Sequence, residues 1–347
     1  MYDYIHIRQE KKMKRKKITM LMLAVSMCTA FLAGCEKEKW NNSGSDEAGM
    51  GREDLKSEEK TTSSSEMYAD FLNDDVQLFF HKYNQYDARG VESYFDEERG
   101  YTLSEIVDVL CAHYFEYTGK TDVGAIKYAY MDCGNDGVQE MAVWFTGMAI
   151  YCEDEDSTLF YIIKEIDDQL ELCYCYETWA RSSASINEYG YYVSSGSGGA
   201  SLHGTEFGYI DENGDWNYIA YIEEQSDISA LSYPEELSQI PTVAASKAYE
   251  GTIVFLTYRF TEYTDADYYA GVEMDDDLYT FEVYDDDYNE ISDESTYIDS
   301  VYKDIFDEAG VLIFSKDEME EMLSERKDAV GVTDEIAEGK ELEWKSI

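Results

Sequence analysis

Three carboxylates between residues 132 and 140 are spaced like the ligands of a calcium-binding loop. If Asp132 is the first loop position, Asp136 falls at the fifth and Glu140 at the ninth, and Gly137 occupies the sixth. Calcium is bound by roughly six to eight oxygens, and calcium loops place oxygen ligands and a turn-forming glycine at these positions. The spacing therefore predicts a shallow calcium turn at Asp132, Asp136 and Glu140.

The same segment departs from an EF-hand and has a purely structural alternative. Gly134 offers no side chain at the third position, and Val143 stands where an EF-hand needs a bidentate glutamate, so an EF-hand is excluded. In the alternative, the segment is a hairpin in which Asp132 accepts hydrogen bonds from the turn backbone. Gly137 then supplies a positive φ, and Glu140 faces solvent.

The order strand, aspartate-rich turn, strand resembles an element of many secreted bacterial proteins, in which such a turn often holds calcium. Residues 128–141 carry this pattern, and the turn 211–215 repeats it weakly, because Trp216 stands where a glycine is wanted. The Asn-Gly pair in the second turn already accounts for a tight hairpin. Calcium is the only cofactor that these patterns indicate, and its binding stays open.

A serine- and glycine-rich stretch, residues 181–203, raises the question of nucleophilic catalysis. Ser197 and Ser201 lie near His203, but Ser195 occupies the place where a nucleophile elbow needs glycine. The stretch also lacks the lysine of a phosphate-binding loop. We interpret it as a flexible loop and keep a surface hydrolase acting on glycan or peptide as the alternative function.

Aromatic residues are abundant, with 32 Tyr and 5 Trp. Several flank the serine-rich stretch and could stack on sugar rings: Trp179, Tyr189, Tyr191, Tyr192 and Trp216. The alternative is that tyrosine fills half-buried strand positions, which suits its shape. A glycan or protein ligand at the cell surface is therefore one expectation for a partner.

The N-terminal residues predict export and lipid attachment. A basic segment ending at Lys17 precedes the apolar run Ile18 to Ala33, and Leu32-Ala33-Gly34-Cys35 closes it. This order resembles the signal peptide of bacterial lipoproteins, which implies cleavage after residue 34 and acylation, for example with palmitate, of the Cys35 thiol. The alternative is an uncleaved span, for which the run is at the short limit. Translation starts at Met1 or at Met13.

Net charge indicates which partners to exclude. The chain carries a formal charge of −48, and removal of residues 1–34 would leave 73 acidic and 20 basic residues. A field of this sign repels phosphate backbones, so we expect no nucleic-acid partner. The expected address is the extracytoplasmic face of the cell membrane, with the membrane contacted through the lipid anchor, because two acyl chains anchor a protein stably.

Five cysteines follow Cys35, and their spacing does not indicate a metal or redox site. They are Cys111, Cys133, Cys152, Cys173 and Cys175, and no two form a Cys-x-x-Cys pair. We expect them to be buried as small apolar residues, with Cys173 and Cys175 on one face of a strand. One disulfide stays open, since the expected compartment is oxidising.

The first half of the chain predicts a linker, two helices and a series of strands. Residues 35–66 are rich in Ser, Glu and Lys and should be disordered. Apolar spacing predicts a helix over 68–83, and Thr102 with Glu105 forms a capping box for a second helix up to residue 114. Period-two patterns predict strands over 126–131, 139–145, 159–166, 169–176, 188–193, 208–210 and 216–222. Because short turns join them, the sheet should be antiparallel.

The last third predicts fewer elements. Tyr233-Pro234-Glu235 opens a helix, strands cover 252–260 and 279–284, and Ser315 caps a helix up to residue 323. The expected fold is α+β, with N-terminal helices on a largely antiparallel, tyrosine-rich sheet and a C-terminal helix. One globular domain covers residues 67–332, with a subdivision near residue 230 left open, and 333–347 form a loose tail.

The combined pattern resembles uncharacterised surface lipoproteins of Gram-positive bacteria. It includes the lipidation signal, the acidic spacer, the paired helices, the aspartate-rich segment and the Ile-Asn-Glu-Tyr-Gly stretch at 186–190. The resemblance covers much of residues 67–225 and implies a location but no activity. We therefore expect a lipid-anchored acidic surface protein that acts as a non-catalytic binding or interaction module, stabilised by calcium if the turn binds it.

Overall fold

A computed structural model describes most of the chain after residue 63. It covers residues 64–82, 94–96, 98–114, 122–148, 157–232, 234–263 and 277–347, all within one compact unit, Thr61–Ile347. The predicted signal peptide 1–34, the start at Met1 or Met13, Cys35, Cys152 and most of the linker lie outside the described residues. Of the helices in these ranges, none combines the length and the apolar character that a membrane span requires.

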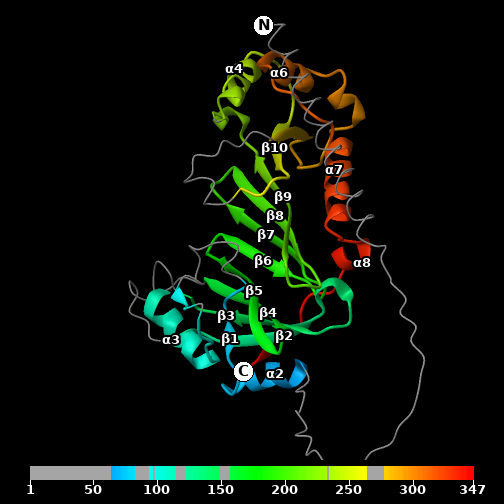
Figure 1. The fold of residues 1–347 in the computed structure, drawn as a ribbon. Coiled ribbons are helices and arrows are strands. Elements are labelled where there is room, and N and C mark those ends of the chain that lie inside the picture. The colour runs from blue at the N-terminus through cyan, green and yellow to red at the C-terminus, as the bar shows by residue number, and fades with distance from the viewer. Residues whose placement is uncertain are drawn as a thin grey trace, which may run out of the picture. The chain divides into compact units, whose positions relative to one another are not determined.

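The first of two six-stranded sheets has the order β1-β5-β4-β3-β2-β12 (Figure 1). Its strands are β1 (Leu78–Phe79), β2 (Ile126–Met131), β3 (Glu140–Phe145), β4 (Thr158–Ile166), β5 (Gln169–Thr178) and β12 (Lys345–Ser346). The short β1 pairs with β5 in parallel, whereas the other pairs are antiparallel. The predicted boundaries of β2 to β5 agree with these strands to within two residues.

Two helices cover one face of the first sheet. They are α2 (Ser64–Leu72) and α3 (Leu103–Tyr114), and Tyr68, Phe71, Ile106 and Leu110 pack from them into one core with Val143 and its neighbours. The predicted capping box forms, because Glu105 N donates to Thr102 Oγ1 and Thr102 N donates to the Glu105 carboxylate. Strand β4 is buried on both faces from Thr158 to Lys164, which explains its continuous apolar run.

The second sheet has the order β11-β10-β9-β8-β7-β6 and is antiparallel throughout. Its strands are β6 (Ser182–Ile186), β7 (Tyr191–Ser197), β8 (Leu202–Ile210), β9 (Trp216–Gln225), β10 (Thr252–Arg259) and β11 (Leu278–Tyr284). Strands β9 and β10 pair directly, so the second sheet runs through residue 230, where a subdivision was left open. The fold is therefore α+β and mostly antiparallel, as predicted, but its strands form two sheets where one was expected.

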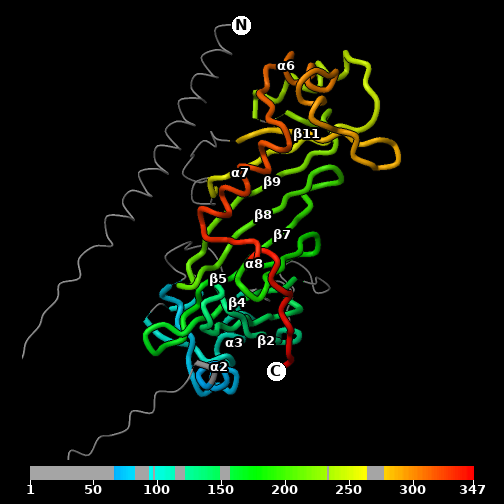
Figure 2. Tube along the Cα trace, turned by 90° about the vertical axis from the view of Figure 1, so that its right-hand side faces the viewer, coloured from blue at the N-terminus to red at the C-terminus, as the bar shows by residue number. Residues whose placement is uncertain are grey.

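Apart from η3, the remaining helices attach to the second sheet. The remaining helices are η3 (Cys133–Asn135), η4 (Ile228–Ala230), η5 (Glu235–Leu237), α4 (Ile240–Ala244), η6 (Glu294–Tyr297), α6 (Val301–Ala309), α7 (Lys316–Ala329) and α8 (Asp334–Ala337). Of these, η3 instead lies in the turn between β2 and β3, in the first sheet. Helices α4 and α6 share a core with β10 and β11. Helices α7 and α8 run along one face of β8 to β10 (Figures 1 and 2), and the predicted capping box of Ser315 and Glu318 starts α7.

The two sheets meet through packed aromatic rings. Tyr176 on β5 contacts Tyr192 on β7 with ring centroids 4.9 Å apart, and Tyr174 stacks on Trp216 at 4.3 Å. The run continues over the first sheet from Tyr176 to Phe160 and Trp144. The junction fixes β6 to β9 relative to β5, because these rings have little space to move.

Three local predictions are wrong. The helix expected over 68–83 ends at Leu72, and the chain turns through Asp74, whose φ is 65°, so that Leu78–Phe79 can join the sheet as β1. The linker expected up to residue 66 ends earlier, because α2 begins at Ser64. Cys173 and Cys175 do not share one face of β5 as expected. A β-bulge opposite Ile162 and Ile163 breaks the register at Cys173, and only Cys175 packs in the core with α2 and α3.

The serine- and glycine-rich stretch and the C-terminal residues are also more ordered than predicted. The stretch expected to be a loop forms β6, β7 and the start of β8, because pairing with neighbouring strands overrides low strand propensity. The predicted loose tail 333–347 forms α8 and β12, and Ile336 and Leu342 are buried. Cys133, Cys173 and Cys175 are buried free thiols, as expected.

Candidate functional site

The Asp132 turn has the geometry of a self-contained hairpin. Asp132 Oδ1 accepts hydrogen bonds from Asp136 N at 2.9 Å and Gly137 N at 3.0 Å, and Asp136 Oδ1 accepts one from Val138 N. Gly137 has a φ of 85°, as the structural alternative requires. The oxygens that would bind calcium are therefore held by the turn backbone.

Glu140 is the member of the predicted trio that differs most from both interpretations. It neither faces solvent nor points to a metal site, because only 1% of its surface is exposed. Its Oε1 forms an ion pair with Lys164 Nζ, and its Oε2 accepts a hydrogen bond from Cys133 N at 2.7 Å. Burial raises the pKa of Glu140, and the bond and charge of Lys164 partly offset that shift.

The structure thus does not bring Asp132, Asp136 and Glu140 together as a ready metal site. Among the residues it describes, no group of three or more His, Cys, Asp or Glu side chains is arranged to hold a metal ion. The second acidic turn behaves in the same way, since Asp211 Oδ1 accepts from Asn213 N and Asp215 N at 2.9 Å each.

Breaking the Glu140–Lys164 pair should destabilise the fold. We expect Glu140→Ala to lower the free energy of unfolding by about 3–5 kcal/mol, because it leaves a buried ammonium and a buried amide without a partner. The double variant Glu140→Met with Lys164→Met should recover much of this loss. Denaturant unfolding measures both, with Asp136→Ala as the exposed control. A Glu140→Ala variant as stable as the control would contradict a structural role for the pair.

The serine residues near His203 do not form a catalytic pair. Ser197 lies opposite His203 in the β7–β8 register, but its hydroxyl donates to the Gly199 carbonyl at 2.8 Å. Ser201 Oγ accepts a hydrogen bond from the Gln225 amide at 3.3 Å. Neither hydroxyl is therefore aligned for proton transfer to the imidazole.

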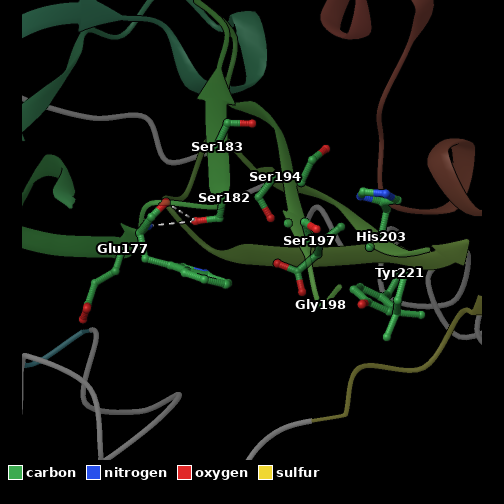
Figure 3. A pocket seen from close by; sticks show the side chains of 14 residues that line it. Glu177, Ser182, Ser183, Ser194, Ser197, Gly198, His203 and Tyr221 are labelled. Atoms are coloured by element: carbon green, nitrogen blue, oxygen red, sulfur yellow. Dashed lines mark hydrogen bonds between the residues drawn. The ribbon is translucent and has the colours of Figure 1, made fainter. Parts of the chain in front are cut away.

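A pocket of about 340 Å³ opens at the same strands, and Ser197 and His203 line it together with Trp179, Ser194, Glu206 and Tyr221 (Figure 3). Strand register places Ala184, Ser194, Glu206 and Tyr221 in one cross-strand row on β6 to β9. The next row is Ser182, Gly196, Gly204 and Glu223. Figure 3 shows the rings of His203 and Tyr221 on opposite sides of β8, as the alternation of a strand requires.

Trp179 forms one wall of the pocket and is held by the turn from β5 to β6. Its backbone N–H donates to Ser182 Oγ at 2.8 Å, and Ser182 Oγ donates to the Trp179 carbonyl at 3.3 Å. The Arg181 guanidinium lies over the indole, 4.9 Å from the ring centroid. The side chain stays 40% exposed, so a well-fixed aromatic surface faces solvent beside the pocket.

Tyr221 forms the opposite wall of the pocket, and its ring lies over Gly204 of β8. A Cβ at Gly204 would collide with the Tyr221 ring, and one at Gly208 would collide with the Trp216 ring. Both aromatic side chains can therefore lie on the sheet because β8 lacks side chains beneath them. Arg259 covers the Tyr221 ring at 5.3 Å and forms ion pairs with Glu223 and Asp277.

Glu206 lies in the row between Ser194 and Tyr221. Its surroundings in the pocket change the pKa of its carboxyl group. Desolvation by burial, with a smaller contribution from the charge of Glu262, raises its pKa to about 7. Its own charge acts on Tyr192, Tyr218 and Tyr221. The carboxyl is consequently part protonated at neutral pH and can then both donate and accept hydrogen bonds.

This shift predicts a pH-dependent contribution to stability. Between about pH 4.5 and 7 the folded state keeps a proton on Glu206 that the unfolded state releases, so stability falls as the pH rises through this window. We expect Glu206→Gln to exceed the wild type at pH 8, by on the order of 1–2 kcal/mol after allowance for partial exposure, and to match it at pH 4. Thermal melting compares the two, with Glu212→Gln as control. An equal difference at both pH values would contradict the shift.

The aromatic residues predicted to stack on sugars divide between the two faces of the sheet. Trp179 lines the pocket, and Tyr192 and Trp216 lie on the same face within the aromatic junction. Tyr189 and Tyr191 instead pack on the opposite face, in the core that contains Val332 and Ile336. Their alternation along β7 and the loop before it accounts for the division.

Sequence reasoning missed Glu206 and Tyr221. A signal was present in Gly204-Thr205-Glu206-Phe207-Gly208, where glycines at both neighbouring same-face positions leave a single carboxyl on one face of a strand. The spacing of Gly204, Glu206 and Gly208 is informative only if the segment is a strand, and the sequence did not predict a strand before residue 208.

Comparison with protein-family models, curated proteins and solved structures gives no match. The function is therefore argued from the geometry of the pocket and from the N-terminal sequence.

Proposed function

We propose that this chain is a lipid-anchored protein of the extracytoplasmic membrane face that binds a ligand in the β6–β9 pocket without transforming it. The N-terminal pattern ending at Cys35 supports the location. The observation that carries the binding role is the pocket, where an exposed indole, a tyrosine ring and a partly protonated carboxyl converge. Concave sites with aromatic walls and a few polar groups are the usual form of a ligand site.

Calcium stabilisation is not included in this proposal. The turns at Asp132 and Asp211 close on their own backbone amides, and Glu140 is bonded to Lys164. An acidic surface of this size still serves a tethered protein by keeping it soluble.

A surface hydrolase is the second candidate, and one observation favours it. Glu206 and Glu262 influence each other, and the pKa of Glu206 is raised to about 7, which suits a general acid. Glycosidases use two carboxyl groups beside the bond that they cleave, and Glu262 is the carboxylate whose charge acts on Glu206. Product release from a bound oligosaccharide, lost in Glu206→Gln, would establish this second function in place of binding alone.

The lipid anchor is tested at Cys35. We expect the native protein to partition into the detergent phase and Cys35→Ala to move to the aqueous phase, because only the lipidated form carries acyl chains. Mass spectrometry should show an N-terminus at Cys35 with added acyl mass. Unchanged partitioning of Cys35→Ala, or an uncut N-terminus, would contradict the anchor. Cys111→Ala is the control, since that thiol lies in α3.

The pocket is tested with a pair of glycine variants in the non-lipidated Cys35→Ala chain. A methyl group at Gly204 displaces the Tyr221 ring, whereas one at Gly199 meets open space in the same hairpin. We expect the parent chain and Gly199→Ala to sediment with isolated bacterial envelopes, and Gly204→Ala to sediment at least about fivefold less, equivalent to roughly 1 kcal/mol. Equal sedimentation of all three would contradict binding through this pocket. Thermal melting confirms that the variants fold.

A further inference from the structure

We propose that the ligand of the β6–β9 pocket is an uncharged saccharide chain, which lies across the strands between Trp179 and Tyr221. This inference rests on the proposed binding function and specifies the chemical class of the ligand. It is carried by three features of the pocket: the position of the two rings, the cations that already cover them, and the small polar floor between them.

The two aromatic walls are placed to contact a flat, extended molecule. Trp179 precedes β6 and Tyr221 lies on β9, so the backbone segments that carry the two rings are three strand spacings apart, roughly 14 Å. The Tyr221 ring reaches back from β9 over Gly204 on β8, which brings the rings closer together than the backbones. The separation of the two segments exceeds the width of one sugar ring and suits a short oligosaccharide. The face of an aromatic ring is electron-rich and attracts positively polarised edges, such as the C–H groups on one face of a pyranose.

Protein cations already occupy positions over both rings. Arg181 lies over Trp179, and Arg259 lies over Tyr221. A cationic ligand would have to compete with these guanidinium groups for the ring quadrupole. Arg259 is also held by Glu223 and Asp277, so it stays over Tyr221, and a ligand contacts that ring only where it lines the pocket. Stacking on an exposed ring face is therefore expected at Trp179, which is 40% exposed. The rings therefore favour a neutral molecule over an amine or a basic peptide.

The floor between the rings carries hydrogen-bonding groups of small size. Ser194 and Glu206 lie in one row and Gly196 in the next, where it adds no side chain beside Ser194, whereas the space above Gly204 is taken by the Tyr221 ring. Hydroxyls and carboxyls that both donate and accept match the hydroxyl groups of a sugar. The floor of this pocket would therefore recognise a ligand by hydrogen bonds to its hydroxyl groups instead of by its charge.

The charges around the pocket also disfavour an anionic ligand. The groups around Glu206 are the carboxylate of Glu262, which raises its pKa, and the hydroxyls of Tyr192, Tyr218 and Tyr221, with Arg259 beyond Tyr221. Glu177 adds a carboxyl group to the lining of the pocket, and the whole chain carries −48. An anionic polysaccharide would meet repulsion from this surface, because an excess of like charge opposes association.

The test compares neutral, cationic and anionic saccharides. Calorimetric titration of the non-lipidated Cys35→Ala chain would use N-acetylglucosamine oligomers as one neutral probe, their deacetylated cationic counterparts, and oligogalacturonate as the anionic probe. Neutral glucan and mannan oligomers complete the panel. We expect saturable binding of at least one neutral oligomer, at least tenfold weaker binding of cationic and anionic ones, and affinity that rises with chain length beyond a single sugar.

Ring variants connect this binding to the pocket. Trp179→Ala and Tyr221→Ala should each weaken binding of the neutral oligomer at least tenfold, whereas Tyr288→Ala, which removes an aromatic ring that is 89% exposed outside the pocket, should leave it unchanged. Absence of binding to every neutral oligomer, tighter binding of a charged oligomer, or equal effects of Trp179→Ala and Tyr288→Ala would each overturn the saccharide assignment.

Failure of this assignment is distinguishable from failure of the binding function itself. If envelope sedimentation depends on Gly204 but is abolished by protease treatment of the envelopes and not reduced by neutral oligomers, the ligand is a protein, and only the saccharide assignment falls. If sedimentation is equal in Gly204→Ala and Gly199→Ala, the pocket does not bind, and both fall. If periodate oxidation of the envelope sugars removes sedimentation, the saccharide assignment is supported.

Discussion

The contact of Tyr176 with Tyr192 is the interaction on which the arrangement of the two sheets depends. It joins β5 at the edge region of the first sheet to β7 of the second, and Phe160, Tyr174 and Trp216 extend the packing on either side. Offset and edge-to-face aromatic pairs each add about 0.5–1.5 kcal/mol beyond the burial of their area. The junction also holds the floor of the pocket, because β6 and β7 form one side of it.

Cations are scarce in this acidic chain, and their positions show how the fold uses them. Lys164 neutralises the buried Glu140, Arg259 joins Glu223 and Asp277, and Lys316 bonds Glu282 and Glu290. Each of these cations links different strands or connects a helix to a strand. Interactions of partly buried charges are screened less by salt than those of exposed ones. The excess carboxylates stay at the surface, where they favour solubility more than they oppose folding.

The period-two pattern from Ile126 to Ile222 was sufficient to predict β2 to β5, most of β9 and parts of β7 and β8, and the two capping boxes located the starts of α3 and α7. The pattern failed where pairing determines structure against local propensity. Strand β6 and the start of β8 consist largely of serine, glycine and threonine, and their strand conformation follows from neighbours that are distant in sequence. The same limit applies to Glu140, since the position of Lys164 on β4 decides that it is buried.

Glycine in the interior of a strand weakens it, because it adds no packing and loses more backbone entropy than other residues. Strands β7 and β8 nevertheless carry Gly196, Gly204 and Gly208 on one face. The Tyr221 and Trp216 rings lie where side chains at Gly204 and Gly208 would otherwise stand. The contact of Trp216 with Gly208 serves the aromatic junction between the sheets, whereas the contact of Tyr221 with Gly204 lies at the pocket, on the face opposite the one that α7 and α8 cover. A glycine in a strand interior that makes room for the Tyr221 ring beside a serine floor supports the proposed ligand-binding role, and the partly protonated Glu206 would give such a contact a polar group without a fixed charge.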